Sequence, residues 1–307
     1  MGLSLIVVRF ALYILLAALF GLSAFSLYGL RPSERGNALA LRPWLGSSAV
    51  IGLALSVAWL VLMASSMAGT PPWPIDREVI SGLLTGSAIG AAWKVRVVAL
   101  VIAAVAAMVA ASRSAGLSIV VLASAVALAT LAWTGHGAMD ENASGWVHLA
   151  ADILHLIASG AWLGALFGLV LLVSRPAARV DPAHLSLTHR ALHGFGTIGT
   201  LVVAAIVLTG LYNGWMLIGI GNVSALPSTL YGQLFILKMA LFVAMLALAS
   251  LNRFRLTPIF ERAIIAHDAQ AALSALRSSL AIETACIITI FVLVAWLGTL
   301  EPPTMSM

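Results

Sequence analysis

Long apolar stretches separated by short polar segments run through the whole sequence. About 20 apolar residues in an α-helix cross the roughly 30 Å of hydrocarbon in a bilayer, and lipid requires backbone polar groups to be satisfied within the helix. The pattern therefore predicts an all-α fold, a polytopic membrane helix bundle with eight transmembrane helices. We place these helices at residues 3–30, 44–68, 83–111, 116–134, 147–173, 194–219, 230–251 and 279–300.

Composition supports this fold class. The chain is 62% apolar and 9% charged, with a mean hydropathy of +1.07, whereas a soluble domain carries about 25% charged residues. Cys286 is the single cysteine, so a disulfide within the chain is impossible. We expect one transmembrane domain over 1–307, divided into an N-terminal half of about 1–134 and a C-terminal half of about 135–307.

The basic residues predict an orientation. The loops after the first, third, fifth and seventh stretches hold eleven arginines, whereas those after the second, fourth and sixth hold Arg77, with Lys94 and Arg96 at the edge of the third stretch. Cytoplasmic loops carry the excess of Lys and Arg, so both termini and the 135–146 loop are predicted to face outside, which is the periplasm in a Gram-negative bacterium. The net charge of +5 therefore reflects membrane topology, and we expect no nucleic-acid partner.

Candidate chemistry gathers at residues 133–166. His148, Asp152 and His155 are spaced i, i+4 and i+7, so they share one face of a helix. The two histidines are about 10 Å apart along the axis and cannot bind one ion together in an unbroken helix. Either Asp152 hydrogen-bonds a histidine ring, or the face forms two sites at successive depths. Both arrangements need ligands from other helices.

Methionines are frequent on the same predicted outer side. Imidazole and thioether ligands without a thiol favour copper, as Cu(I) or Cu(II). We predict metal binding by His136, His148, Asp152 and His155, with Met63, Met67, Met139 and Met216 as possible additional ligands. Ordinary packing is the alternative for Met63 and Met67, and simple solvation is the alternative for His148.

Other polar residues have structural or pathway interpretations. Arg9 and Lys238 lie about as deep as His155, and either could neutralise Asp152 in a salt bridge. His184, His189 and His193 fall in a polar segment that we interpret as an exposed cytoplasmic loop. Glu283 is predicted to lie near the cytoplasmic edge and either to extend its carboxylate to the polar interface or to pair with Arg277, with an inner exit ligand as the alternative.

At these residues the sequence resembles the CopD family of bacterial copper-tolerance inner-membrane proteins. Single segments are weak evidence, but their order covers essentially the whole second half, whereas the first 130 residues match mainly in the number of spans. The segments are Gly135-His136-Gly137, His148, Asp152-Ile153-Leu154-His155-Leu156, Ala161-Trp162-Leu163-Gly164, Thr209-Gly210-Leu211-Tyr212-Asn213, Tyr231-Gly232, Lys238, Asn252-Arg253, Arg277-Ser278, Glu283, Gly298-Thr299 and Pro302-Pro303.

The resemblance implies an eight-span copper protein of the inner membrane that acts with a periplasmic copper-binding partner of the CopC type and moves copper inward. We expect no enzymatic activity, and the chain has no Walker A motif with which to hydrolyse ATP. One alternative is a haem-binding electron carrier or cupric reductase that uses His155 as an axial ligand, with Arg9 and Lys238 holding propionates. Another is a sensor or assembly subunit that presents copper without transporting it.

Overall fold

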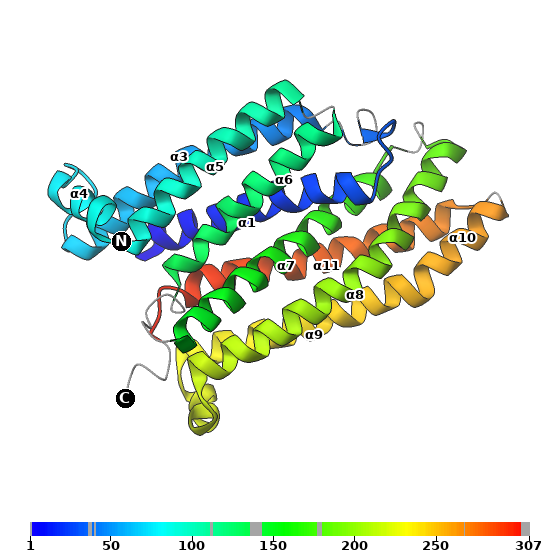
Figure 1. Ribbon diagram of the computed structural model, residues 1–307. Coiled ribbons are helices and arrows are strands. Elements are labelled where there is room, and N and C mark those ends of the chain that lie inside the picture. Colours follow the sequence, from blue (N-terminus) through cyan, green and yellow to red (C-terminus); the bar gives the residue numbers. More distant parts are fainter. Residues whose placement is uncertain are drawn as a thin grey trace.

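The computed structural model describes residues 2–35, 39, 41–110, 113–135, 143–176, 180–266 and 268–301. These residues form helices, with no strand among them (Figure 1). Eight helices in the described part of the chain are long and apolar enough to cross a membrane, which confirms the predicted helix bundle.

The first half of the chain contributes four of these helices. They are α1 (Gly2–Tyr28), α3 (Leu41–Ala68), α5 (Ala88–Ala110), and α6 (Ser114–Ala129) with its 3-10 extension η1 (Thr130–Thr134); the short helix α4 (Arg77–Gly86) precedes α5. Helix α1 lies inside the bundle, where it contacts α3, α6, α7 and α11. Its central residues, such as Leu16 and Leu19, are fully buried.

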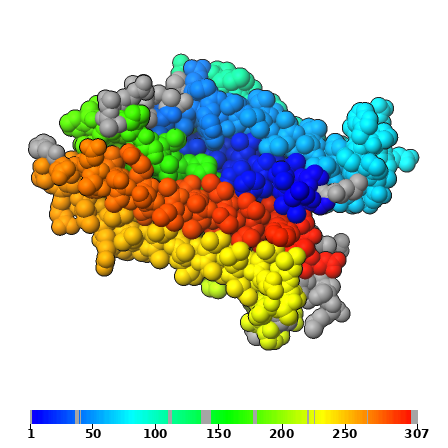
Figure 2. Space-filling model, turned by 180° about the vertical axis from the view of Figure 1, so that it is seen from behind, coloured from blue at the N-terminus to red at the C-terminus, as the bar shows by residue number. Residues whose placement is uncertain are grey.

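The second half adds α7 (Ala143–Val173), α8 (Pro182–Ile218), α9 (Leu230–Leu251) and α11 (Gln270–Leu297). A 3-10 helix η4 (Ile220–Ser228) joins α8 to α9, and a π-helical turn η5 (Asn252–Leu256) leads from α9 into α10 (Thr257–Ile265). Helix α1 begins and α11 ends at the end of the bundle that carries α4 and η4, which we call the α4 end; the opposite end is the α10 end (Figure 1). From behind, α11 runs along the surface between α1 and α9 (Figure 2).

Helices α1 and α7 make the closest contact in the bundle. A Cβ atom built on Gly21 would overlap the carbonyl oxygen of Gly160, and one built on Gly164 would overlap the backbone of Gly21. Small residues allow helix backbones in membranes to approach closely, and dispersion contacts then stabilise the pair. Gly164 of the Ala161–Gly164 segment is therefore explained by packing.

Helices α8 and α9 are packed differently from α1. Within the described residues, α8 packs on α7 and α10 and α9 packs on α11, but α8 and α9 are not packed closely on each other. Only 11% of the most apolar 18-residue window is buried in each of these helices. Most of their surface is therefore left for lipid, and they leave room for a cavity between them.

Three predicted boundaries were wrong. The 83–111 stretch is broken at Ser87, which has extended backbone angles. The helix before the break, α4, is capped by Asp76, whose side chain accepts from the N–H groups of Glu78 and Val79 at 3.1 Å. Helix α8 begins at Pro182 instead of 194, capped by Asp181, which accepts from His184 N at 2.7 Å. Helix α11 begins at 270 instead of 279. Hydropathy marks where lipid begins, whereas caps set where a helix begins.

Candidate functional site

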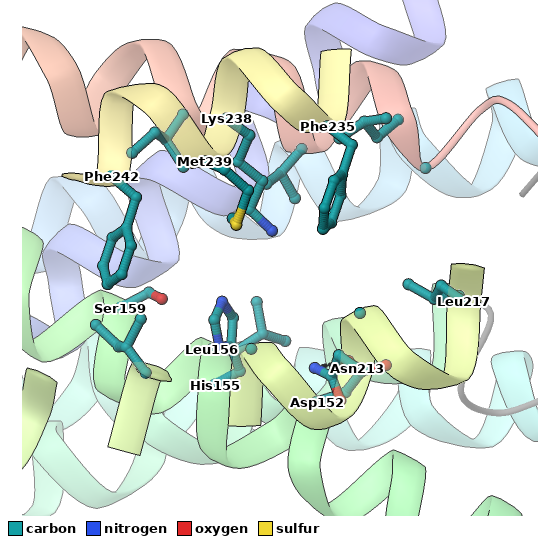
Figure 3. A pocket seen from close by; sticks show the side chains of 18 of the residues that line it. Asp152, His155, Leu156, Ser159, Asn213, Leu217, Phe235, Lys238, Met239 and Phe242 are labelled. Atoms are coloured by element: carbon teal, nitrogen blue, oxygen red, sulfur yellow. Dashed lines mark hydrogen bonds between the residues drawn. The ribbon is translucent and has the colours of Figure 1, made fainter. Parts of the chain in front are cut away.

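A cavity of about 610 Å³ lies between α7, α8, α9 and α11, toward the α4 end (Figure 3). Its walls are mostly apolar and aromatic, and the polar side chains are few. Residues of η4 and Gly298, just after α11, line it at the α4 end, and Ser159, Met245 and Ile287 line it toward the α10 end. Five residues carry its chemistry: Arg9, Asp152, His155, Lys238 and Met239.

His155 is held in one orientation by α8. Its Nδ1 lies 2.9 Å from Thr209 Oγ1, and the Thr209 hydroxyl itself donates to the carbonyl oxygen of Ala205. The hydroxyl therefore accepts from Nδ1–H, which leaves the lone pair on Nε2 as the ligand atom of the ring. Gly210 makes room for the ring, because a Cβ there would lie 3.4 Å from His155 Cε1.

Asp152 also has its partner on α8. Its Oδ1 accepts from Asn213 Nδ2 at 2.6 Å, so the carboxylate does not hold the His155 ring. In the described part of the chain, no ion pair within 4.0 Å joins Asp152 to Arg9 or Lys238. The salt bridge considered as an alternative is therefore not formed at that distance, although Lys238 faces the same cavity as Asp152.

Two cations remain on the cavity wall. Arg9 is only 6% exposed, and its Nε has no hydrogen-bond partner among the described residues. Its guanidinium lies against Gly298, where a Cβ would collide with it. With Lys238, Arg9 gives the cavity two positive charges against the single carboxylate of Asp152, so anionic or electron-rich groups are favoured over bare cations.

Met239 is the ligand-type residue that sequence reasoning missed. It follows Lys238 on α9, and its sulfur and the His155 ring point toward each other across the cavity (Figure 3). Met245 also lines the cavity, two turns further along α9. A methionine in an apolar stretch is usually a packed core residue. The one sequence signal that could have identified Met239 is that it lies at about the same depth in the membrane as His155.

The other predicted ligands that the structure describes are not brought to the cavity. His148 is 3% exposed and stacks edge-on with Tyr212 at 6.3 Å between ring centroids, so the solvated alternative was wrong. Met63 packs against the core, Met67 is 61% exposed, and neither they nor Met216 line the cavity. His136 and Met139 lie outside the described residues. The described part of the chain contains no group of three or more His, Cys, Asp and Glu residues arranged to hold a metal ion.

Polar residues near the α10 end also depart from the predictions. His184 is 5% exposed instead of lying in an open loop; its Nδ1 accepts from Arg175 at 3.0 Å and its Nε2 donates to Leu172 O at 3.0 Å. His189 lies 3.8 Å from Glu261. Glu283 does not pair with Arg277, which instead donates to Val173 O.

Arg96 is the other misplaced cation. The sequence suggested a position at a membrane edge, but its side chain is fully buried between α3, α5 and η1. Its Nε donates to Thr130 Oγ1 at 2.9 Å, and its guanidinium lies 5.2 Å from the centroid of the Trp59 ring. The ring face and the hydroxyl partly offset the cost of burying the charge.

Comparison with known proteins covers both halves of the chain. Residues 1–149 match the family model described as "Copper resistance protein D-like, N-terminal domain", and residues 189–297 match "Copper resistance protein D". The chain is 45% identical over 300 residues to Copper resistance protein D of Pseudomonas syringae pv. tomato, an alignment that covers 97% of this chain and 96% of that protein.

Two further relatives are more distant. Copper transport protein CutJ of Bacillus subtilis (strain 168) is 27% identical over 250 residues, which cover 80% of this chain and 45% of that protein. Inner membrane protein YebZ of Escherichia coli (strain K12) is 27% identical over 175 residues, which cover 56% of this chain and 55% of that protein. No solved structure matches the chain.

Proposed function

This chain belongs to the copper resistance protein D family, and from that premise we propose that it takes copper from the periplasm and moves it into or across the inner membrane. The observation that carries the proposal is the pair of copper-ligand types, His155 from α7 and Met239 from α9, facing each other in one cavity (Figure 3). In this proposal copper is cargo, and the chain catalyses no covalent reaction.

The ligand set fits copper chemically. A thioether favours Cu(I), and an imidazole with a free Nε2 binds either oxidation state. Thr209 supports His155 as outer partners of metal-bound histidines do, by holding the other ring nitrogen. Lys238 and Arg9 oppose a bare cation, and Asp152 offsets one of these charges. We therefore expect weak and transient binding in the cavity, as conduction requires.

The route into the cavity follows from the predicted orientation. If both termini face the periplasm, the α4 end is the outer end, and Gly135 before the 136–142 segment lines the cavity directly. His136 lies within that segment and is the proposed first ligand. A periplasmic CopC-type protein is the proposed donor, supported by family membership alone; faster copper delivery from its loaded form than from free copper would test this.

Metal analysis of the purified full-length protein, held at equilibrium with free copper, tests the site. His155→Ala is expected to remove most bound copper, because it deletes the imidazole that faces the cavity. His189→Ala is the matched control, since this ring lies near the α10 end beside Glu261. Met239→Leu is expected to weaken Cu(I) more than Cu(II). Equal copper loss in the His155 and His189 variants, or full retention in His155→Ala, would refute the site.

A second candidate function rests on the size of the cavity. A single water occupies about 30 Å³ of liquid, whereas cavities of about 300–1,000 Å³ hold organic ligands. At about 610 Å³, with His155 opposite Met239 and with Arg9 and Lys238 available for carboxylates, the cavity is suited to haem. Histidine and methionine are the axial ligands of some cytochromes. A Soret band in the purified protein, absent in His155→Ala, would support an electron carrier or cupric reductase.

A further inference from the structure

A second polar cluster lies in the bundle interior, centred on Glu283 of α11. This side chain is 1% exposed; its Oε1 accepts from Trp162 Nε1 at 2.8 Å and its Oε2 accepts from Asn252 Nδ2 at 2.9 Å. Both donors are neutral, and no Lys, Arg or His of the described residues lies within 4.0 Å of the carboxylate. Burial of an ionised carboxylate without a cation is costly, so the site needs a positive partner.

The cluster lies next to the cavity, on the side of the α10 end. On α7, α9 and α11 the last cavity-lining residues toward the α10 end are Ser159, Met245 and Ile287. Toward the α10 end, Trp162 lies three positions beyond Ser159 and Asn252 lies seven positions beyond Met245. Glu283 lies four positions beyond Ile287 in the same spatial direction, since α11 runs the opposite way. These separations are about 4 to 10 Å along a helix. Three helices that line the cavity therefore meet again at one carboxylate before the α10 end is reached.

Two buried oxygens beside the carboxylate have no hydrogen-bond partner within the described residues. They are Oδ1 of Asn252, which is 7% exposed, and Oγ of Ser279, which is 6% exposed and lies one turn from Glu283 on the same face of α11. Asn252 also begins the π-helical turn η5, and such turns are frequent at functional sites. The cluster thus holds oxygens that are able to accept from a hydrogen added to the carboxylate.

We propose that Glu283 binds an exchangeable proton and forms an inner, proton-operated gate below the cavity. In the structure the carboxyl group accepts from Asn252 Nδ2, as an ionised carboxylate does. When a proton from water adds to Glu283, the new O–H donates to Asn252 Oδ1 after the amide turns over, or to Ser279 Oγ. The proton returns to water when the O–H bond breaks again. Asn252 is therefore able to hydrogen-bond Glu283 whether the carboxyl group is ionised or protonated.

Among the described residues, the arginines nearest in sequence to Glu283 and Asn252 have other partners and do not neutralise the Glu283 carboxylate. Arg277 is bonded to Val173 O and Arg253 to Thr200 Oγ1. Other charged or titratable groups on the elements packed against α11, or on α11 itself, are Arg9, Tyr13 and Tyr28 on α1, His148, Asp152 and His155 on α7, Tyr231 and Lys238 on α9, Arg255 on η5, Glu261 and Arg262 on α10, and Cys286 on α11.

Infrared spectroscopy of the purified full-length protein tests proton binding directly. With Asp152→Asn in every sample, so that the other carboxyl group inside the bundle does not contribute, a pH change should produce the band of a protonated, buried carboxyl group in the otherwise unchanged protein and in Glu78→Gln, whose carboxylate is exposed, but not in Glu283→Gln. Asn252→Ala should shift the pH midpoint of that band, and it keeps the test open if Glu283→Gln does not fold. The same band in Glu283→Gln, or a band that Asn252→Ala leaves unchanged, would overturn the proposal.

Copper uptake into proteoliposomes tests the coupling, which rests on the proposed transport function. Uptake by the wild type should depend on pH at the α10 side by up to about tenfold per unit, the limit for one proton, and Glu283→Gln should remove that dependence. Uptake that depends on Na⁺ and not on pH would identify a metal cation in place of a proton. Absence of uptake by the wild type would refute transport, while the infrared result would still decide whether Glu283 binds a proton.

Discussion

Thr209→Val is the sharpest test of how the cavity positions a copper ligand. Valine has nearly the shape of threonine, so packing between α7 and α8 should persist. The change removes the oxygen that accepts from His155 Nδ1–H at 2.9 Å. The ring then loses this partner and retains its hydrogen bond to the backbone of Ile206, at a cost of up to about 1–3 kcal/mol, or it moves its proton to Nε2 and loses the lone pair that faces the cavity.

Both outcomes weaken the ligand without removing it. Loss of such an outer partner typically reduces metal affinity by about 10- to 100-fold, or about 1.4–2.7 kcal/mol. Copper titration against a competing chelator, on the detergent-purified protein, measures this change. Thr209→Ser keeps a hydroxyl and should bind nearly as the wild type does.

A matched control is available on α11. Thr289→Val removes another hydroxyl that donates to the carbonyl four residues earlier, at 2.8 Å from Ala285 O, but it does so on an exposed helix face. This variant should bind copper normally. If Thr209→Val binds copper as tightly as the wild type, then Thr209 does not position the ligand, and His155 is not held as the hydrogen bond indicates.

Three further predictions address charge, packing and topology. Asp152→Asn should stay folded with a stability loss of about 1 kcal/mol, because the new amide oxygen can still accept from Asn213; a large loss rescued by Lys238→Met would instead reveal an ion pair. Gly164→Leu should reduce the yield of folded protein by overpacking the α1–α7 contact, at a cost of about 1–3 kcal/mol, as measured by thermal unfolding in detergent. A cysteine in place of the exposed Ser186, in a Cys286→Ser background, should resist labelling from outside the cell but react after permeabilisation, since the arginine distribution predicts that the α10 end faces the cytoplasm.

The eight helices could be predicted because long apolar stretches leave few alternatives in lipid. The breaks could not be predicted equally well, because they depend on local hydrogen bonds. Asp76 and Asp181 begin helices by accepting backbone N–H groups, and Ser87 ends α4 with an extended backbone. None of these residues changes the hydropathy profile enough to be seen in it.

His155 and Asp152 could be singled out because a polar side chain in an apolar helix needs a partner. Which partner it has depends on the facing helix, and the sequence contains no direct record of that packing. Thr209 and Asn213 on α8 are short neutral side chains, whereas the alternative partners Arg9 and Lys238 were suggested by their charge and their depth in the membrane.

The partner of Glu283 was also predicted wrongly from the sequence. Its position was judged from its distance to the polar end of an apolar stretch, and Arg277 was the nearest cation in sequence. Because α11 begins at Gln270, Glu283 lies near the middle of that helix, where Trp162 and Asn252 reach it from two other helices. Trp162 lies in an apolar stretch and would be interpreted from the sequence as a core residue, but its indole N–H donates to a buried carboxylate.

The packing of the bundle explains why both polar clusters lie in the second half of the chain. The close α1–α7 contact leaves no space between those helices, whereas α8 and α9 are not packed closely on each other and the cavity lies between them. An ion that enters at the α4 end meets His155 and Met239 before it reaches the carboxylate of Glu283. Since α7, α9 and α11 contribute to both clusters, a shift of any one of these helices changes both together. In the proposed mechanism, these three helices connect copper in the cavity with the proton at Glu283.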